Sequence, residues 1–90
     1  MSVQYEILVR GRVQGVGFRA SARNMARSLK LKGWVENNPE GTVRVVICGK
    51  KESCTQFIQW CRRGSGYSWV ESLEIKEIPS ELFTSFSIRY

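Results

Sequence analysis

The residues best suited to chemistry lie in a glycine-rich stretch that ends in an arginine, GVGFR at residues 15–19. Gly15 and Gly17 can adopt backbone angles that other residues avoid, so successive N–H groups can turn toward one point. A helix that begins just after them would add unpaired N–H groups and partial positive charge. Arg19 would add a planar fork of donors that suits two phosphate oxygens. The stretch therefore predicts a compact phosphate cradle that needs no metal.

Other phosphate-binding motifs do not fit this stretch. Gly11, Gly15 and Gly17 lack the spacing of the dinucleotide-binding fingerprint, and no Gly-Lys-Ser/Thr of a nucleoside-triphosphate loop follows them. No cysteine precedes an arginine with five residues between them, as a cysteine phosphatase would require. Loop chemistry alone leaves one alternative open, a tight turn whose glycines serve packing and whose arginine is solvated.

The composition favours an anionic partner and excludes several kinds of site. The chain has 14 lysine and arginine residues against 8 acidic residues, a formal charge of +6. Nucleic acid, a membrane surface or a small phosphorylated metabolite would each fit that charge. Histidine is absent, which excludes histidine acid–base catalysis, a phosphohistidine intermediate and most zinc chemistry.

Cysteine usage and length indicate one intracellular domain. The three cysteines, Cys48, Cys54 and Cys61, are an odd number without a Cys-x-x-Cys pair, which favours reduced thiols over disulfides. No stretch combines the basic start and apolar run of a signal peptide, and none has the apolar length of a membrane span. We expect a cytoplasmic protein whose residues 1–90 form a single domain.

The elements that would position the glycine-rich stretch follow from hydrophobic patterning. Alternation and β-branched runs predict strands near residues 3–10, 34–35, 42–48, 70–75 and 86–90, and helical spacing predicts helices near 18–29 and 52–63. In the second helix Cys54, Phe57, Ile58 and Cys61 share the apolar stripe, so we expect both cysteines to be buried. This order is that of an α+β protein, a ferredoxin-like αβ sandwich. It is βαββαβ with an extra C-terminal strand, and two helices cover one face of a mostly antiparallel five-stranded sheet.

Two segments resemble the signatures of a known family, the acylphosphatases. VRGRVQGVGFR, from Val9 to Arg19, resembles the first signature, with its Gly-x-Val-Gln-Gly-Val-x-Phe-Arg core intact. GWVENNPEGTVRVVICG, from Gly33 to Gly49, resembles the second. The two segments are correctly ordered and spaced, and the predicted order of strands and helices matches the family along the rest of the chain.

The resemblance implies an acylphosphatase, which hydrolyses the carboxyl–phosphate bond of acyl phosphates to a carboxylate and inorganic phosphate without metal, cofactor or covalent intermediate. It implies that Arg19 and Asn37 are catalytic and that Asn37 holds the attacking water. The phosphate-binding residues that it implies are Gln14, Gly15, Val16, Gly17, Phe18 and Arg19. With it we expect a small acyl phosphate as the partner, phosphate or sulfate as a competing anion, no nucleic-acid or membrane partner, and a monomer.

The residue types suit that reaction. A carboxylate whose conjugate acid has a pKa of roughly 4 to 5 leaves without protonation, so no general acid is needed. The remaining tasks are to stabilise charge on the phosphoryl oxygens and to place one water. Arg19 and the loop amides serve the first task, and Asn37, with one acceptor and two donors, serves the second. We expect Gln14 to shape the loop through its backbone.

Some positions depart from the family pattern, and other functions remain as alternatives. Glu36 stands where the family usually has a neutral or basic residue, and on a strand it should face away from Asn37. Tyr67 and Trp69 replace a segment that commonly contains proline and alanine. The alternatives are a module that binds acyl phosphates without turnover and an RNA-binding domain. RNA binding needs stacking aromatics on the central strands, and TVRVVIC has none.

Overall fold

The computed structural model describes residues 2–64, 66–79 and 83–90. Its elements follow the predicted order: β1 (Ser2–Arg12), α1 (Phe18–Ser28), β2 (Lys32–Asn37), β3 (Val43–Lys50), α2 (Lys51–Arg63), β4 (Trp69–Glu77) and β5 (Phe86–Arg89). The prediction was wrong in detail for Tyr90, which lies just beyond the last strand. Within the described residues, neither helix is long and apolar enough to cross a bilayer.

The sheet has five strands in the order β4-β1-β3-β2-β5. β3 is the central strand and lies between β1 and β2. β1 is antiparallel to β3 and β4, and β2 is antiparallel to β3. β5 pairs in parallel with β2, from Gly33 opposite Phe86 to Glu36 opposite Arg89. The ferredoxin-like α+β fold is therefore confirmed, and the sheet is mixed because of this last pair.

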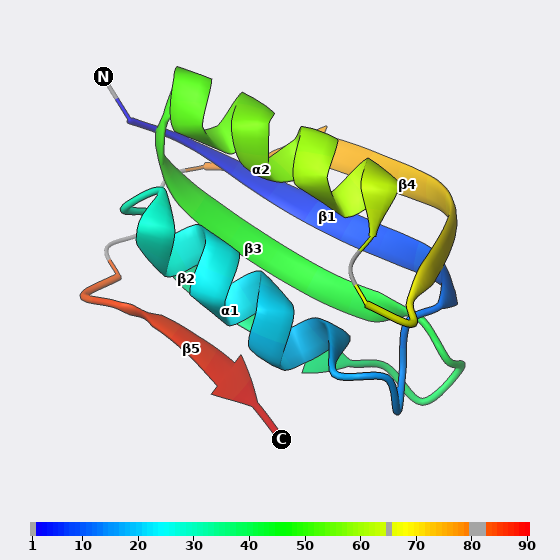
Figure 1. Ribbon diagram of the computed structural model, residues 1–90. Coiled ribbons are helices and arrows are strands. Elements are labelled where there is room, and N and C mark those ends of the chain that lie inside the picture. Colours follow the sequence, from blue (N-terminus) through cyan, green and yellow to red (C-terminus); the bar gives the residue numbers. More distant parts are fainter. Residues whose placement is uncertain (1, 65, 80–82) are drawn as a thin grey trace.

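Both helices lie across the same face of the sheet (Figure 1). Alternate strand residues point toward the helices and close a core with the buried sides of α1 and α2. The core includes Ile7, Val9, Val35, Val45 and Ile47 from the strands, and Phe18, Ala22, Ala26, Cys54, Phe57, Trp60 and Cys61 from the helices. Burial of Cys54 and Cys61 is confirmed. Trp60 was missed as a core residue, and Ile58 is only half-buried.

The topology gathers several chain segments at one end of the sheet. The loop of residues 13–17 joins the end of β1 to the start of α1, and the turn of residues 38–42 joins β2 to β3. Since β1 and β2 are both antiparallel to β3, their last residues lie at the same end. β5 runs parallel to β2, so it also ends there. This end of the sheet is where the predicted site residues meet.

Candidate functional site

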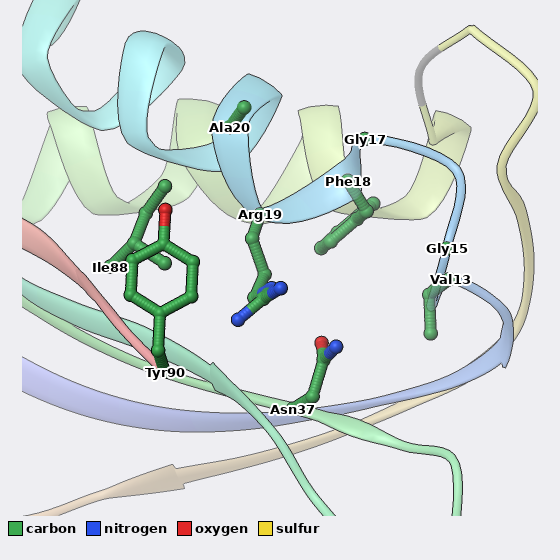
Figure 2. Close-up of a pocket in the computed structure, with 9 residues that line it drawn as sticks. All are labelled: Val13, Gly15, Gly17, Phe18, Arg19, Ala20, Asn37, Ile88 and Tyr90. Carbon is green, nitrogen blue, oxygen red and sulfur yellow. The ribbon is translucent and has the colours of Figure 1, made fainter.

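A small hollow of about 160 Å³ opens at this end of the sheet. The loop contributes Val13, Gly15 and Gly17, the first turn of α1 contributes Phe18, Arg19 and Ala20, β2 contributes Asn37, and the last residues contribute Ile88 and Tyr90. Figure 2 shows the Arg19 and Asn37 side chains directed into the same space from opposite sides. Among the described residues that line the hollow, none has an acidic side chain. The arrangement therefore suits an anion.

The loop backbone supplies donors because two glycines adopt left-handed angles. Gly15 has φ 74° and Gly17 has φ 79°, and a Cβ at either position would meet open space. The glycines are therefore required by conformation and not by crowding. Gly17 is also the N-cap of α1, which has no side-chain cap and no acidic residue in its first turn. The N–H groups of the first turn thus have no side-chain acceptor at the cap and remain available to a ligand.

The guanidinium of Arg19 is held by the end of β5. Its Nη1 donates a hydrogen bond to the backbone oxygen of Arg89 at 3.2 Å. The Tyr90 ring lies beside it, with the guanidinium carbon 4.9 Å from the ring centroid. An arginine has five N–H donors, so this single bond leaves most of the fork free for phosphate oxygens. The contacts fix the direction of Arg19 before any ligand arrives.

Asn37 presents an unused hydrogen-bond acceptor. It is the last residue of β2, and no residue that the structure describes makes a hydrogen bond to its buried Oδ1. A buried acceptor without a donor is costly, on the order of 1–3 kcal/mol, so a water that donates to it would be favoured. Glu36 does not line the hollow and its cross-strand neighbour is Arg44, which agrees with the expectation that it faces away from Asn37.

Gln14 and Val16 do not line the hollow, although both belong to the predicted phosphate-binding set. Gln14 acts through its side chain: its Nε2 donates to the backbone oxygens of Asn38 and Thr42, each at 2.8 Å. The expectation that Gln14 shapes the loop through its backbone missed these two side-chain hydrogen bonds. The Val16 side chain is half-buried and packs against the core. For both residues only the backbone N–H remains a candidate ligand.

Sequence reasoning missed the part of the site formed by the C-terminal residues. Ile88 and Tyr90 line the hollow, as do Val13 and Ala20. The alternation of Phe86, Ile88 and Tyr90 indicated a strand, but a strand pattern does not say which edge of a sheet it joins. Tyr67 and Trp69 are exposed and do not line the hollow. Tyr67 lies just before β4, which begins at Trp69, and residue 65 of the same stretch lies outside the described residues.

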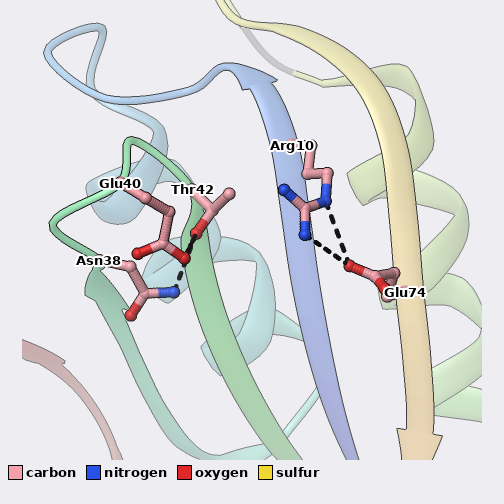
Figure 3. A network of polar contacts seen from close by, with 5 residues as sticks. All are labelled: Arg10, Asn38, Glu40, Thr42 and Glu74. Carbon is pink, nitrogen blue, oxygen red and sulfur yellow. Dashed lines mark hydrogen bonds and ion pairs between the residues drawn. The ribbon is translucent and has the colours of Figure 1, made fainter.

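A polar network fixes the turn that follows Asn37 (Figure 3). Asn38 Nδ2 donates to Thr42 Oγ1, and that hydroxyl donates to Glu40, both at 2.9 Å. A backbone hydrogen bond and the Thr42 hydroxyl keep the pKa of Glu40 below its usual value. Arg10 lies on the neighbouring strand and pairs with Glu74 at 3.1 Å. Arg10 is thus engaged away from the hollow.

Comparisons with known proteins find similar sequences and similar structures. The family model described as Acylphosphatase matches residues 5–88. The acylphosphatase of Methylococcus capsulatus is 45% identical over 83 residues, which cover 91% of this chain and 90% of that protein. An acylphosphatase structure from Coxiella burnetii superposes with a TM-score of 0.95 at 35% identity and covers 98% of this chain and 93% of its own. The crystal structure from Bacillus subtilis gives 0.94 at 39% identity, with coverage of 98% and 99%.

Proposed function

The chain belongs to the acylphosphatase family and hydrolyses acyl phosphates, and we propose that Arg19 and Asn37 are its catalytic residues. The guanidinium of Arg19 and the N–H groups of residues 14–18 bind the phosphoryl group, and Asn37 holds the attacking water. One observation carries this assignment. The buried, unpaired Oδ1 of Asn37 faces the guanidinium of Arg19 across a hollow at an uncapped helix N-terminus.

Binding would use donors that are already directed at the hollow. The amides after Gly15 and Gly17 and the fork of Arg19 would together surround the phosphoryl oxygens. Charge spread over these oxygens in a loose transition state would be stabilised by the same donors, which need no reorganisation. The acyl group would leave toward solvent.

The chemical step would be a direct displacement by water. The water oxygen forms a bond to phosphorus while the bond between phosphorus and the acyl oxygen breaks, and the carboxylate leaves with that electron pair. Oδ1 of Asn37 would accept one hydrogen of the water and so point its lone pair at phosphorus. The second water proton would pass to a phosphoryl oxygen. The products are a carboxylate and inorganic phosphate, with no covalent enzyme intermediate and no general acid.

The test is hydrolysis of acetyl or benzoyl phosphate in excess chelator, with inorganic phosphate as inhibitor. We expect turnover by the unmodified chain. Arg19→Ala should lose turnover on the order of 10³-fold or more and should also lose inhibition by phosphate. Asn37→Ala should lower kcat by roughly 10²–10³-fold while inhibition by phosphate persists.

Two results would contradict the assignment. A fall in phosphate affinity that parallels the fall in rate would make Asn37 a ligand of the phosphoryl group and not the holder of water. Phosphate binding by the folded, unmodified chain without any hydrolysis would favour a module that only binds. Circular dichroism on each variant would establish that the loss is not one of folding.

Several finer properties belong to the same proposal. Inorganic phosphate or sulfate should compete with substrate because both present the tetrahedral anion that the donors of the hollow suit. The three cysteines carry no disulfide, which supports a cytoplasmic location. The buried residues form one core cluster, which supports a single domain over residues 1–90. The proposal also includes a monomer that acts on small acyl phosphates, without nucleic-acid or membrane partners.

A further inference from the structure

The side chain of Gln14 connects the two segments that carry the proposed catalytic groups. Its Nε2 donates one hydrogen bond to the oxygen of Asn38 and one to the oxygen of Thr42, both at 2.8 Å. Gln14 belongs to the loop that ends at Arg19, whereas Asn38 follows Asn37 directly. Both N–H bonds of the carboxamide are thus used across the space between loop and turn.

The two acceptor oxygens belong to the turn that follows β2. The Thr42 oxygen also accepts the backbone N–H of Asn38 at 2.8 Å, which closes the turn between β2 and β3. Thr42 is 5% exposed, and Val43 after it is the cross-strand partner of Asn37. One carbonyl therefore sets both the closure of the turn and the distance from the turn to the loop.

The loop needs such a tether because its own backbone provides little stiffness. Gly15 and Gly17 have no side chains to pack, and both adopt left-handed angles in open space. The Gln14 side chain does not line the hollow, so it cannot touch the phosphoryl group itself. Its effect on the reaction must pass through the groups that it holds in register.

We propose that Gln14 is a positioning residue whose carboxamide sets the separation between the phosphate loop and Asn37. Through that separation it aligns the water on Asn37 with the phosphoryl group on the loop. This inference rests on the proposed role of Asn37. Misplacement of reacting groups by about 1 Å costs on the order of 10²-fold in rate. Loss of the Gln14 hydrogen bonds should therefore lower kcat measurably.

The test compares side chains that remove the two donors with one that keeps them. Gln14→Met keeps the length of the side chain and removes both hydrogen bonds, and Gln14→Asn keeps the donors on a shorter stem. We expect Gln14→Met to lower kcat by roughly 10- to 10²-fold with little change in inhibition by phosphate, because the Arg19 contacts are intact. We expect Gln14→Asn to recover part of that loss. Gln56→Met, the same change at an exposed position of α2, should leave kcat unchanged.

A double-variant cycle shows whether Gln14 acts through Asn37. If it does, Gln14→Met should have no further effect on kcat in a chain that already carries Asn37→Ala. An equal fall in both backgrounds would overturn the proposal, since Gln14 would then act without Asn37. A rise in the inhibition constant of phosphate that matches the fall in kcat would also overturn it, because Gln14 would then shape the cradle.

The cycle also separates this inference from the proposal on which it rests. Full activity in the single variant Asn37→Ala would remove the role of Asn37, whatever Gln14→Met does. If Asn37→Ala lowers kcat as expected while Gln14→Met keeps full activity, only the proposed role of Gln14 is overturned. Urea unfolding of every variant gives the folded fraction, so that rates are compared for folded protein.

Discussion

At the scale of single residues, the site depends on the planar shape of one guanidinium. Arg19 donates to the backbone oxygen of Arg89, lies beside the Tyr90 ring and still has donors for the hollow. An ammonium lacks the planar fork that can donate two parallel hydrogen bonds to phosphate oxygens while a further N–H bonds to the oxygen of Arg89. The charge alone is therefore insufficient for the proposed role.

Arg19→Lys tests this point because it keeps the charge and removes the fork. We expect kcat/KM for benzoyl phosphate to fall on the order of 10²-fold, less than for Arg19→Ala. Inhibition by phosphate should weaken but remain measurable. Steady-state assays of both variants side by side provide the measurement, and equal rates for lysine and arginine would show that only charge matters here.

The sequence allowed the placement of residues within one local motif to be predicted. The left-handed glycines and Arg19 form one continuous segment, so their meeting at a helix N-terminus could be foreseen. The second signature indicated Asn37, and the hollow does bring its side chain opposite Arg19. The tether from Gln14 could not be foreseen because its acceptors are backbone oxygens 24 and 28 residues away.

At the scale of elements, β5 completes the site from the edge of the sheet. The backbone oxygen of Phe86 accepts two hydrogen bonds from Arg27 of α1, at 3.0 and 3.3 Å. The guanidinium of Arg89 stacks over Trp34, 4.0 Å from the ring centroid. Trp34 precedes Val35, which is buried under the helices, so Trp34 lies on the opposite face of the sheet. β5 is therefore attached from both faces.

Tyr90→Ala tests whether this strand contributes to anion binding. Tyr90 is 98% exposed, so the loss of its side chain should leave the free energy of unfolding nearly unchanged. A cation–π contact at an exposed site is weak, and its loss should raise the inhibition constant of phosphate about two- to fivefold. Tyr67→Ala, at an exposed tyrosine outside the hollow, is the matched control and should change neither quantity. Unchanged phosphate inhibition in Tyr90→Ala would exclude the ring from the site.

Local sequence patterns could predict the helices and strands, but they could not predict which strands pair in the sheet. Helical spacing from Phe18 located α1, and β-branched residues located β3. The parallel pairing of β5 with β2 depends on Phe86 reaching the core beside Phe57, 6.4 Å away between ring centroids, and on the bonds from Arg27. These contacts join residues far apart in the sequence, so the local pattern of β5 could not predict them.

At the scale of the whole molecule, the cysteines link stability to alkaline pH. Burial, with a smaller effect of nearby Cys48, raises the pKa of Cys54 to about 11, and burial raises that of Cys61 as well. In the unfolded chain both thiols would ionise near their ordinary value of 9.0. Above that pH the unfolded state loses protons that the native state keeps, so stability falls as pH rises from about 9 to about 11.

Urea unfolding between pH 8 and pH 11 measures this effect. Other groups titrate in the same range, so the comparison is with Cys54→Ala, which removes one of the two thiols. We expect the free energy of unfolding of the unmodified chain to fall more steeply with pH than that of Cys54→Ala. Identical slopes would show that the Cys54 thiol ionises equally in both states.

Cys48→Ser should leave catalysis intact, because Cys48 does not line the hollow.

The strand order also has a kinetic consequence. Among the paired strands only β2 and β3 follow each other in the chain, so their hairpin can close within microseconds, whereas β1 must find β3 and β4 across long stretches of sequence. Asn37 and Thr42 belong to that early hairpin, and the glycine loop is seated only when β1 docks. During refolding, the return of turnover should therefore follow the slow, non-local collapse and not the first appearance of β-structure.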